Sequence, residues 1–116
     1  MKRVLVGGYY GFDNAGDEAI LTALLADLRA QDATLAVTVV TGDAAATAAH
    51  GVGTVPWTDV AAIAAAVQQA DLVILGGGGL FQDYWGCDPD TMFTPRHHGV
   101  AFYGGFPLLS AALGRP

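Results

Sequence analysis

Two short aliphatic runs that lead straight into glycines constrain the fold of this chain more than any other feature. The first is residues 3–7 (RVLVG), and the second is residues 72–75 (LVIL), which four consecutive glycines follow. Short runs of branched aliphatic residues bounded by glycine are typical of buried β-strands. Residues 34–41 and 53–55 are expected to form two further strands for the same reason.

The segments between these strands carry helical periodicity. Residues 17–30 are expected to form a helix with one apolar face, made of Ile20, Leu21, Leu24, Leu25 and Leu28. Asn14 is placed to cap that helix. A short helix is expected at residues 44–50. Another begins at Thr58 or Asp59 and carries an apolar face of Val60, Ile63, Ala64 and Val67.

The last third of the chain is less regular. Residues 83–94 are polar and are expected to be irregular. A final helix is expected over residues 94–113, beginning at Thr94-Pro95, with a kink or break near Pro107.

Strands that alternate with helices predict an α/β fold, a Rossmann-like parallel sheet with helices on both faces. The expected strand order is 3-2-1-4, and residues 1–116 form a single domain. The sequence stops where a helix ends and another strand of such a fold would begin. We therefore expect this chain to be the N-terminal part of a longer protein.

Composition excludes several classes of protein. Of the 116 residues, 53% are apolar and 14% are charged, which excludes intrinsic disorder. The net charge of −6 argues against nucleic-acid binding. A single cysteine, Cys87, excludes a disulfide framework. There is no signal peptide, and residues 97–114, with Pro107 and four glycines, fall short of the roughly 20 apolar residues of a membrane span. A cytoplasmic protein without a transmembrane segment is expected.

The glycine-rich loops are expected to flank one ligand crevice. In a parallel sheet the crevice lies beyond the carboxyl ends of the strands, and order 3-2-1-4 makes the loops after strands 1 and 4 neighbours. Neither loop fits a standard nucleotide motif. Tyr9 and Phe81 break the GxGxxG pattern, and the only lysine, Lys2, excludes a P-loop.

Two longer segments carry a specific resemblance. Residues 8–21 (GYYGFDNAGDEAIL) and 71–83 (DLVILGGGGLFQD) resemble, in sequence and spacing, the opening of the polysaccharide pyruvyl transferase family. The resemblance extends to the C-terminal Leu-Gly-Arg-Pro and is weakest over residues 42–69. It implies the first part of a two-domain enzyme of glycosyltransferase-B-like architecture. Such enzymes transfer the pyruvyl group of phosphoenolpyruvate to a sugar during cell-wall or exopolysaccharide synthesis.

The resemblance also implies site residues. The family's Asn-x-Gly-Asp-Glu pattern corresponds to Asn14, Gly16, Asp17 and Glu18. Asp17 is then a candidate catalytic residue that orients acceptor hydroxyls or acts as a general base. The alternative, that its carboxylate only complements the helix dipole, stays open.

The second glycine segment supplies further candidates. Its glycines and the following polar pair correspond to the family's glycine run and Gln-Asp pair, namely Gly76, Gly77, Gly78, Gly79, Gln82 and Asp83. Asp83 is the second candidate catalytic residue, and its alternative role is to accept hydrogen bonds from loop amides.

Other residues are candidates for substrate contact. Tyr10 is expected either to stack on a sugar ring or to fill the edge of the core. Arg96 either contacts the anionic substrate or is a solvated surface residue. No metal site is expected, although His97 and His98 lie near two aspartates, and no cofactor is expected.

The most specific interpretation is the N-terminal domain of a pyruvyl transferase, inactive on its own. Phosphoenolpyruvate carries about three negative charges, which an acidic chain with one basic cluster is poorly suited to bind. The alternative is a non-catalytic nucleotide- or nucleotide-sugar-binding module. Because residues 72–75 and the helix ending at residue 113 are expected to leave an apolar edge uncovered, the isolated chain is also expected to form a homodimer.

Overall fold

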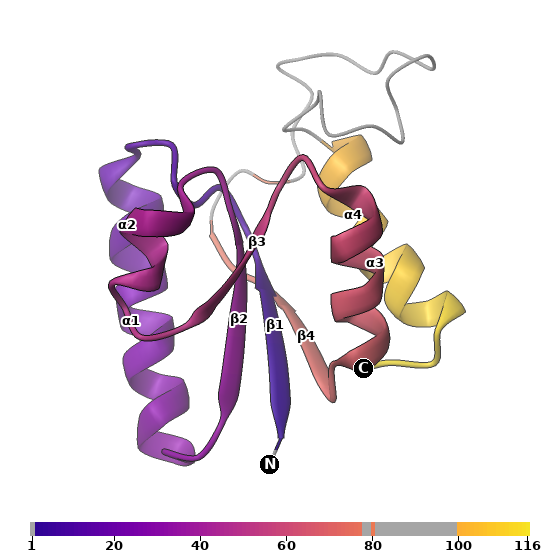
Figure 1. The fold of residues 1–116 in the computed structure, drawn as a ribbon, viewed down its shortest axis with the longest axis horizontal. Helices are drawn as coiled ribbons and strands as arrows, with labels where there is room; N and C mark the ends of the chain where they lie inside the picture. The colour runs from indigo at the N-terminus through magenta and orange to yellow at the C-terminus, as the bar shows by residue number, and fades with distance from the viewer. Residues whose placement is uncertain (1, 78–79, 81–99) are drawn as a thin grey trace.

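The chain forms a four-stranded parallel β-sheet, shown in Figure 1. The computed structural model describes residues 2–77, 80 and 100–116. The strands are β1 (Arg3–Gly7), β2 (Ala36–Thr41), β3 (Gly53–Pro56) and β4 (Leu72–Leu75). Their order is β3-β2-β1-β4, and every neighbouring pair is parallel. The predicted α/β fold with strand order 3-2-1-4 is therefore confirmed.

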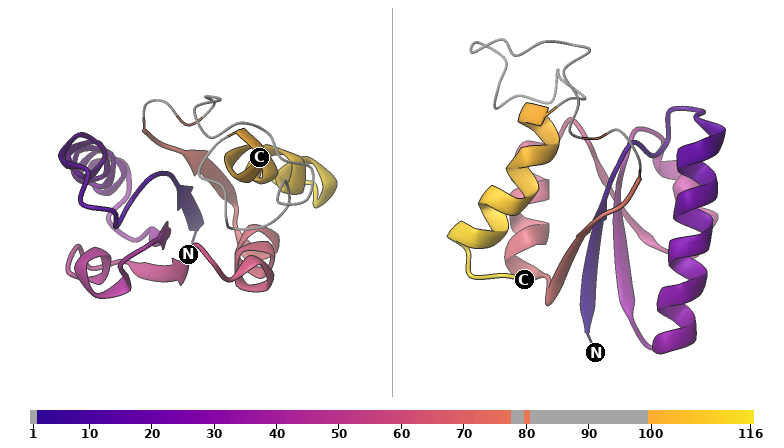
Figure 2. Two further views of the ribbon diagram at one scale, coloured as in Figure 1. Left: turned by 90° about the horizontal axis from the view of Figure 1, so that it is seen from above. Right: turned by 180° about the vertical axis from the view of Figure 1, so that it is seen from behind.

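Helices cover both faces of the sheet, which makes the fold Rossmann-like. They are α1 (Ala15–Gln31), α2 (Ala44–Ala48), α3 (Val60–Gln69) and α4 (Val100–Ala112). Helices α1 and α2 lie on one side, and α3 and α4 on the other (Figures 1 and 2). Because every neighbouring pair of strands is parallel, the carboxyl ends of the four strands lie at the same edge of the sheet.

The core divides into two layers because successive side chains of β1 point to opposite faces. Val4 and Val6 pack with Leu21 and Leu25 of α1. Leu5 packs on the other face, in a cluster with residues of α3 and α4 that includes Ile63, Val67, Tyr103 and Phe106. Central strand β1 is thus buried on both sides, as a strand of a parallel sheet should be.

The observed bounds of the elements differ from the predicted ones by small, explicable amounts. Helix α1 begins at Ala15 rather than Asp17, directly after its N-cap Asn14. Strand β2 begins at Ala36 rather than Thr34. Thr34 belongs to a turn instead, because its N–H and hydroxyl both donate to Asp32 Oδ1, at 2.8 and 2.6 Å.

Two residues of the predicted apolar faces, Ile20 and Val60, are exposed. Ile20 is 41% exposed, whereas Leu21 and Leu25 are buried. Successive helical residues are about 100° apart around the axis, so Ile20 lies beyond the stripe that Leu21 and Leu25 define. Val60, the first residue of α3, is likewise exposed.

Of the predicted kink or break at Pro107, the break does not occur. Helix α4 runs from Val100 to Ala112 with Pro107 inside it. Proline lacks an N–H, so the carbonyl four residues earlier loses its usual donor while the helix continues. The predicted start at Thr94-Pro95 and the irregular segment 83–94 lie outside the described residues. In the described part of the chain, no helix is both long and apolar enough to cross a membrane.

The burial pattern of α1 yields a stability prediction. Leu25→Ala should lower the free energy of unfolding by about 2–5 kcal/mol, because it empties a closely packed site. Ile20→Ala should change it by no more than about 0.5 kcal/mol, because that side chain is already solvated. Urea denaturation followed by circular dichroism measures both, and equal losses would contradict the assignment of the buried face.

Candidate functional site

The two glycine loops meet at the carboxyl edge of the sheet, as the strand order requires. The hydroxyl of Tyr10, in the loop after β1, donates to the Gly76 carbonyl after β4 at 2.7 Å. The Gly76 N–H in turn donates to the Gly7 carbonyl at 2.9 Å. These two hydrogen bonds join segments almost 70 positions apart in sequence into one rim.

Tyr10 fills the edge of the core and does not face the crevice. Its side chain has no exposed surface, so the interpretation of Tyr10 as a sugar-stacking residue is wrong for this conformation. Burial first, and then the charges of Asp17 and Glu18, raise the pKa of Tyr10 to about 12. The hydroxyl therefore remains protonated and able to donate at neutral pH.

The loop after β1 is also anchored to the loop after β2. The Tyr10 carbonyl accepts a hydrogen bond from the Gly42 N–H at 2.9 Å and from the buried Thr41 hydroxyl at 3.3 Å. Thr41 is itself 2.8 Å from the buried Thr47 hydroxyl. Gly11 has φ +82°, and a Cβ there would collide with Thr41 and Gly42. The path of this loop therefore depends on glycine at position 11.

An aromatic cluster lies beside the same loop. The rings of Tyr9 and Phe12 are 4.5 Å apart, and Phe12 meets Trp57 edge-on at 5.5 Å. Trp57 follows β3, so all four strands deliver residues to this edge. The sequence analysis missed Trp57, although its position directly after a predicted strand is the signal that could have found it.

The N-terminus of α1 is fastened to the loop by side chains. Asn14 Oδ1 accepts the Asp17 N–H at 3.1 Å, which confirms the predicted cap. Glu18 Oε1 accepts the Gly11 N–H at 2.7 Å. Gly16 lies in the first turn, where a Cβ would come within 3.3 Å of Asn14 Oδ1. Glu18 therefore holds the loop in position through the Gly11 N–H. The sequence analysis had identified Glu18 only as part of the Asn-x-Gly-Asp-Glu pattern.

Asp17 lies between α1 and the second glycine loop. A Cβ on Gly77 would be 2.9 Å from Asp17 Oδ1, and Gly77 has φ +124°. Glycine at position 77 therefore lets backbone and carboxylate approach closely. In the described part of the chain, no group donates a hydrogen bond to this carboxylate, and the helix cap is the side chain of Asn14.

The electrostatics of Asp17 differ from those of an ordinary helix-terminal acid. Burial, followed by repulsion from Glu18, raises the pKa of Asp17 above its usual 3.8. A helix N-terminus alone would lower this pKa, so burial and the neighbouring charge outweigh the dipole. A carboxylate with a raised pKa is a better proton acceptor than a solvated one.

The structure brings part of the predicted site together. Asn14, Gly16, Asp17 and Gly77 lie at one edge of the sheet, with Tyr10 buried beneath them. The other predicted residues lie outside the described residues, namely Gly78, Gly79, Gln82, Asp83, Arg96, His97 and His98. Over residues 2–77, 80 and 100–116, no three His, Cys, Asp or Glu side chains are grouped as metal ligands.

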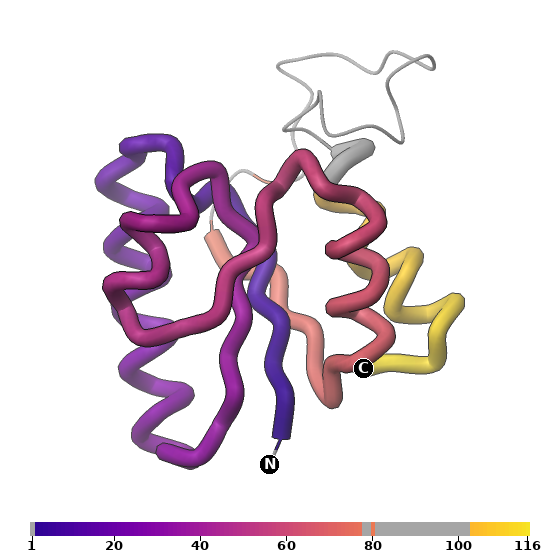
Figure 3. The backbone as a smooth tube through the Cα atoms, viewed as in Figure 1, coloured from indigo at the N-terminus to yellow at the C-terminus, as the bar shows by residue number. Residues whose placement is uncertain are grey.

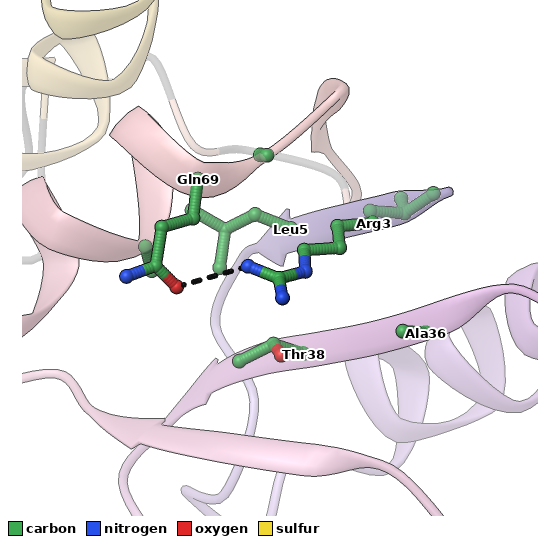
Figure 4. Close-up of a pocket in the computed structure, with 8 residues that line it drawn as sticks. Arg3, Leu5, Ala36, Thr38 and Gln69 are labelled. Carbon is green, nitrogen blue, oxygen red and sulfur yellow. Dashed lines mark hydrogen bonds between the residues drawn. The ribbon is translucent and has the colours of Figure 1, made fainter. Parts of the chain in front are cut away.

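A separate cavity lies at the opposite end of the strands (Figure 4). It measures about 240 Å³ and is lined by residues of β1, β2 and α3, including Arg3, Thr38 and Gln69. The Arg3 guanidinium donates to Gln69 Oε1 at 3.4 Å. Because Arg3 begins β1, this cavity is remote from the glycine loops and belongs to no part of the crevice.

Compared with known proteins, the chain matches no family model, no curated protein and no solved structure. Its function is therefore inferred from the geometry of the glycine loops at the carboxyl edge of the sheet and from their motifs.

The Tyr10 hydrogen bond yields a second prediction. Tyr10→Phe should lower the free energy of unfolding by about 1–3 kcal/mol, because it leaves the Gly76 carbonyl without this donor. Chemical denaturation at pH 7 measures the loss. An unchanged stability would show that the two loops are not joined through this hydroxyl.

The raised pKa of Tyr10 predicts that the stability of the fold decreases at alkaline pH. The pKa of Tyr10 rises from 10.0 in the unfolded chain to about 12 in the fold. The unfolded state therefore releases its proton first, and stability falls as pH rises from 10 through about 12. Tyr10→Phe should flatten this fall. Part of it should persist, because burial also raises the pKa of Tyr103.

Proposed function

We propose that this chain is the acceptor-binding, N-terminal domain of a pyruvyl transferase of glycosyltransferase-B-like architecture, acting in the cytoplasm. The enzyme would transfer the pyruvyl group of phosphoenolpyruvate to a sugar of a cell-wall or exopolysaccharide precursor. The observation that carries the proposal is the Asp17 carboxylate, held against Gly77 between two joined loops with its pKa raised. The resemblance of both loop sequences to that family supports it.

The crevice offers what a sugar hydroxyl requires. A hydroxyl that attacks an electrophile must lose its proton, and a positioned carboxylate can accept it. Asp17 is partly buried and has no competing donor among the described residues, so it can accept a hydrogen bond from a sugar. The rigid anchoring of the loop by Glu18 and Thr41 fixes where that sugar would lie.

The proposed reaction assigns the proton movements as follows. A general acid protonates the methylene carbon of phosphoenolpyruvate, and the cationic carbon that results is attacked by a sugar hydroxyl. Asp17 takes the proton of that hydroxyl as the new carbon–oxygen bond forms. Phosphate then leaves with the electrons of its carbon–oxygen bond, and a second hydroxyl of the same sugar attacks the cation that remains and loses its proton to water, which closes a cyclic ketal. Asp83, from the second glycine segment, is proposed as the other acid–base or orienting carboxylate.

Phosphoenolpyruvate itself would bind away from the N-terminus of α1. Asp17 and Glu18 place negative charge there, which repels a phosphate. Arg96 is proposed as one cationic contact, and further cations would come from a second domain. We therefore expect this chain alone to release no phosphate from phosphoenolpyruvate in the presence of sugars. Sustained release by the purified chain would contradict this division of roles.

The same two acids weigh against the alternative of a nucleotide-binding module. Rossmann-like folds that bind nucleotides place a phosphate at the N-terminus of the first helix. Here that position carries Asp17, and the carboxylate of Glu18 already accepts the Gly11 N–H.

Replacing Asp17 tests the proposed role. Asp17→Asn should lower the rate of pyruvyl transfer by the complete enzyme about tenfold or more, because the amide cannot accept the proton. The Asn14 cap should survive, since it uses the backbone N–H of residue 17. The stability of the chain at pH 7 should stay equal or rise slightly, because a raised carboxylate pKa means that the charged form disfavours folding.

Asp27→Asn, an exposed substitution on the same helix, is the matched control and should leave both quantities unchanged. If Asp17→Asn transfers at the normal rate, or if it unfolds the chain, Asp17 has only a structural role.

Calorimetry of the 116-residue chain separates the two functions. Methyl hexosides should bind weakly, and Asp17→Asn should abolish the binding, whereas UDP-hexoses should bind no better than the simple sugars. Tight binding of UDP-hexoses together with no response to hexosides would instead establish the nucleotide-sugar module.

A further inference from the structure

The cavity at the amino ends of the strands differs in its chemistry from the glycine loops. It lies where β1 begins and α3 ends, at the end of the molecule that carries the N-terminus (Figure 3). Its apolar lining includes Leu5, Ala36, Ala66 and Ala70, and none of the described residues that line it is acidic. A lining of small apolar side chains without negative charge suits a ligand that has a short hydrocarbon part.

Polar side chains from three elements face this cavity (Figure 4). Arg3 of β1 donates to Gln69 Oε1 of α3 at 3.4 Å, and Thr38 lies beside them on β2. The remaining N–H groups of Arg3, the amide N–H groups of Gln69 and the hydroxyl of Thr38 can still donate. Over the described ranges of the chain, no other acceptor engages these donors. The cavity therefore offers converging hydrogen-bond donors.

The guanidinium of Arg3 has no acidic partner within the part of the chain that the structure describes. Asp71, which follows α3, accepts the backbone N–H of Arg3 through Oδ2 at 2.8 Å and does not pair with the guanidinium. That hydrogen bond, with a smaller contribution from the charges of Lys2 and Arg115, holds the pKa of Asp71 below its usual 3.8. The positive charge of Arg3 is thus left for a ligand, in a chain whose net charge is −6.

We propose that this cavity binds a small aliphatic monocarboxylate, with its carboxylate on Arg3 and its hydrocarbon part over the apolar lining. The planar guanidinium can donate two parallel N–H bonds to a carboxylate, and Gln69 and Thr38 can donate to the same group. At about 240 Å³ the cavity is smaller than the roughly 300–1,000 Å³ of pockets for drug-sized ligands, so it fits a ligand of a few carbon atoms. The site is remote from the glycine loops and does not rest on the proposed function.

The end of α3 favours a singly charged ligand over phosphate. Gln69 is the last residue of α3, and the last carbonyl groups of a helix carry partial negative charge. One guanidinium can offset a single carboxylate at this position. Phosphate carries more charge and is typically bound by the free amides of a helix N-terminus or by several cations. Here the backbone N–H of Arg3 is already held by Asp71.

NMR titration of the 116-residue chain with isobutyrate at pH 7 tests the proposal. The amide signals of Arg3, Thr38 and Gln69 should shift to saturation with one dissociation constant, about 1 mM for a small ligand with a single charged contact. Isobutyramide has the same shape without the charge and should bind about tenfold more weakly or worse. Inorganic phosphate should produce no saturable shift of these signals.

Variants separate the guanidinium from general charge. Arg3→Gln should weaken isobutyrate binding about tenfold or more, and it should leave the fold intact because Arg3 is exposed and its backbone N–H to Asp71 remains. Lys2→Gln is the matched control, since it makes the same change in charge one residue away and outside the lining. It should change the dissociation constant less than about twofold. Ala66→Leu should abolish binding by filling the cavity while Arg3 is retained.

The same spectra show whether each variant is folded, and several results would overturn the proposal. A wild-type chain whose signals do not respond to isobutyrate has no such site. Binding of isobutyramide or phosphate as tight as that of isobutyrate would show that the cavity does not select a carboxylate with a hydrocarbon part. Equal weakening by Arg3→Gln and Lys2→Gln would assign the effect to the overall charge of the chain.

Discussion

The hydrogen bond from the Tyr10 hydroxyl to the Gly76 carbonyl joins the two glycine loops at the carboxyl edge of the sheet. Parallel strands bring the loops after β1 and β4 to the same edge, but adjacency alone does not fix their separation. Tyr10 fixes the separation of the two loops, because its ring is fully buried and its hydroxyl stays protonated with a pKa of about 12. Gly8 and Gly76 pack against this ring so closely that neither could carry a Cβ without displacing it. The rim of the crevice is thus built on a buried aromatic residue.

The chemistry of Asp17 follows from that arrangement. Asn14 caps α1, and Glu18 holds the Gly11 N–H, so both neighbouring polar side chains are already engaged. Asp17 is left facing Gly77, partly shielded from water and close to a second negative charge. These surroundings raise its pKa. Among the described residues no group donates a hydrogen bond to this carboxylate, and a carboxylate made more basic by its surroundings suits proton transfer better than it suits stability.

The sequence predicted the elements better than the orientation of individual side chains. Strands β1 and β4 occupy the predicted residues because aliphatic runs bounded by glycine leave little choice, and the caps Asn14 and Asp59 mark where α1 and α3 begin. Tyr10 could not be placed from its pattern, since an aromatic residue in a glycine-rich loop can face either the core or the solvent. The apolar spacing predicted that Ile20 is buried, but spacing does not show how wide a strip of the helix surface the sheet covers. Helix α4 continues through Pro107, and the local rule for proline could not decide between a kink and a break. Asp83, Gln82 and Arg96 belong to the proposed site by motif alone.

The pKa of the Asp17 carboxyl group, measured by carbon-detected NMR titration of the folded chain, tests the central claim most directly. The account predicts a value above the usual 3.8, because burial against Gly77 and repulsion from Glu18 outweigh the helix dipole. Glu18→Gln should then bring the value down, since it removes the neighbouring charge. A pKa at or below 3.8 in the wild-type chain would mean that Asp17 is a solvated helix-terminal carboxylate, and it would contradict the proposal that Asp17 is a proton acceptor.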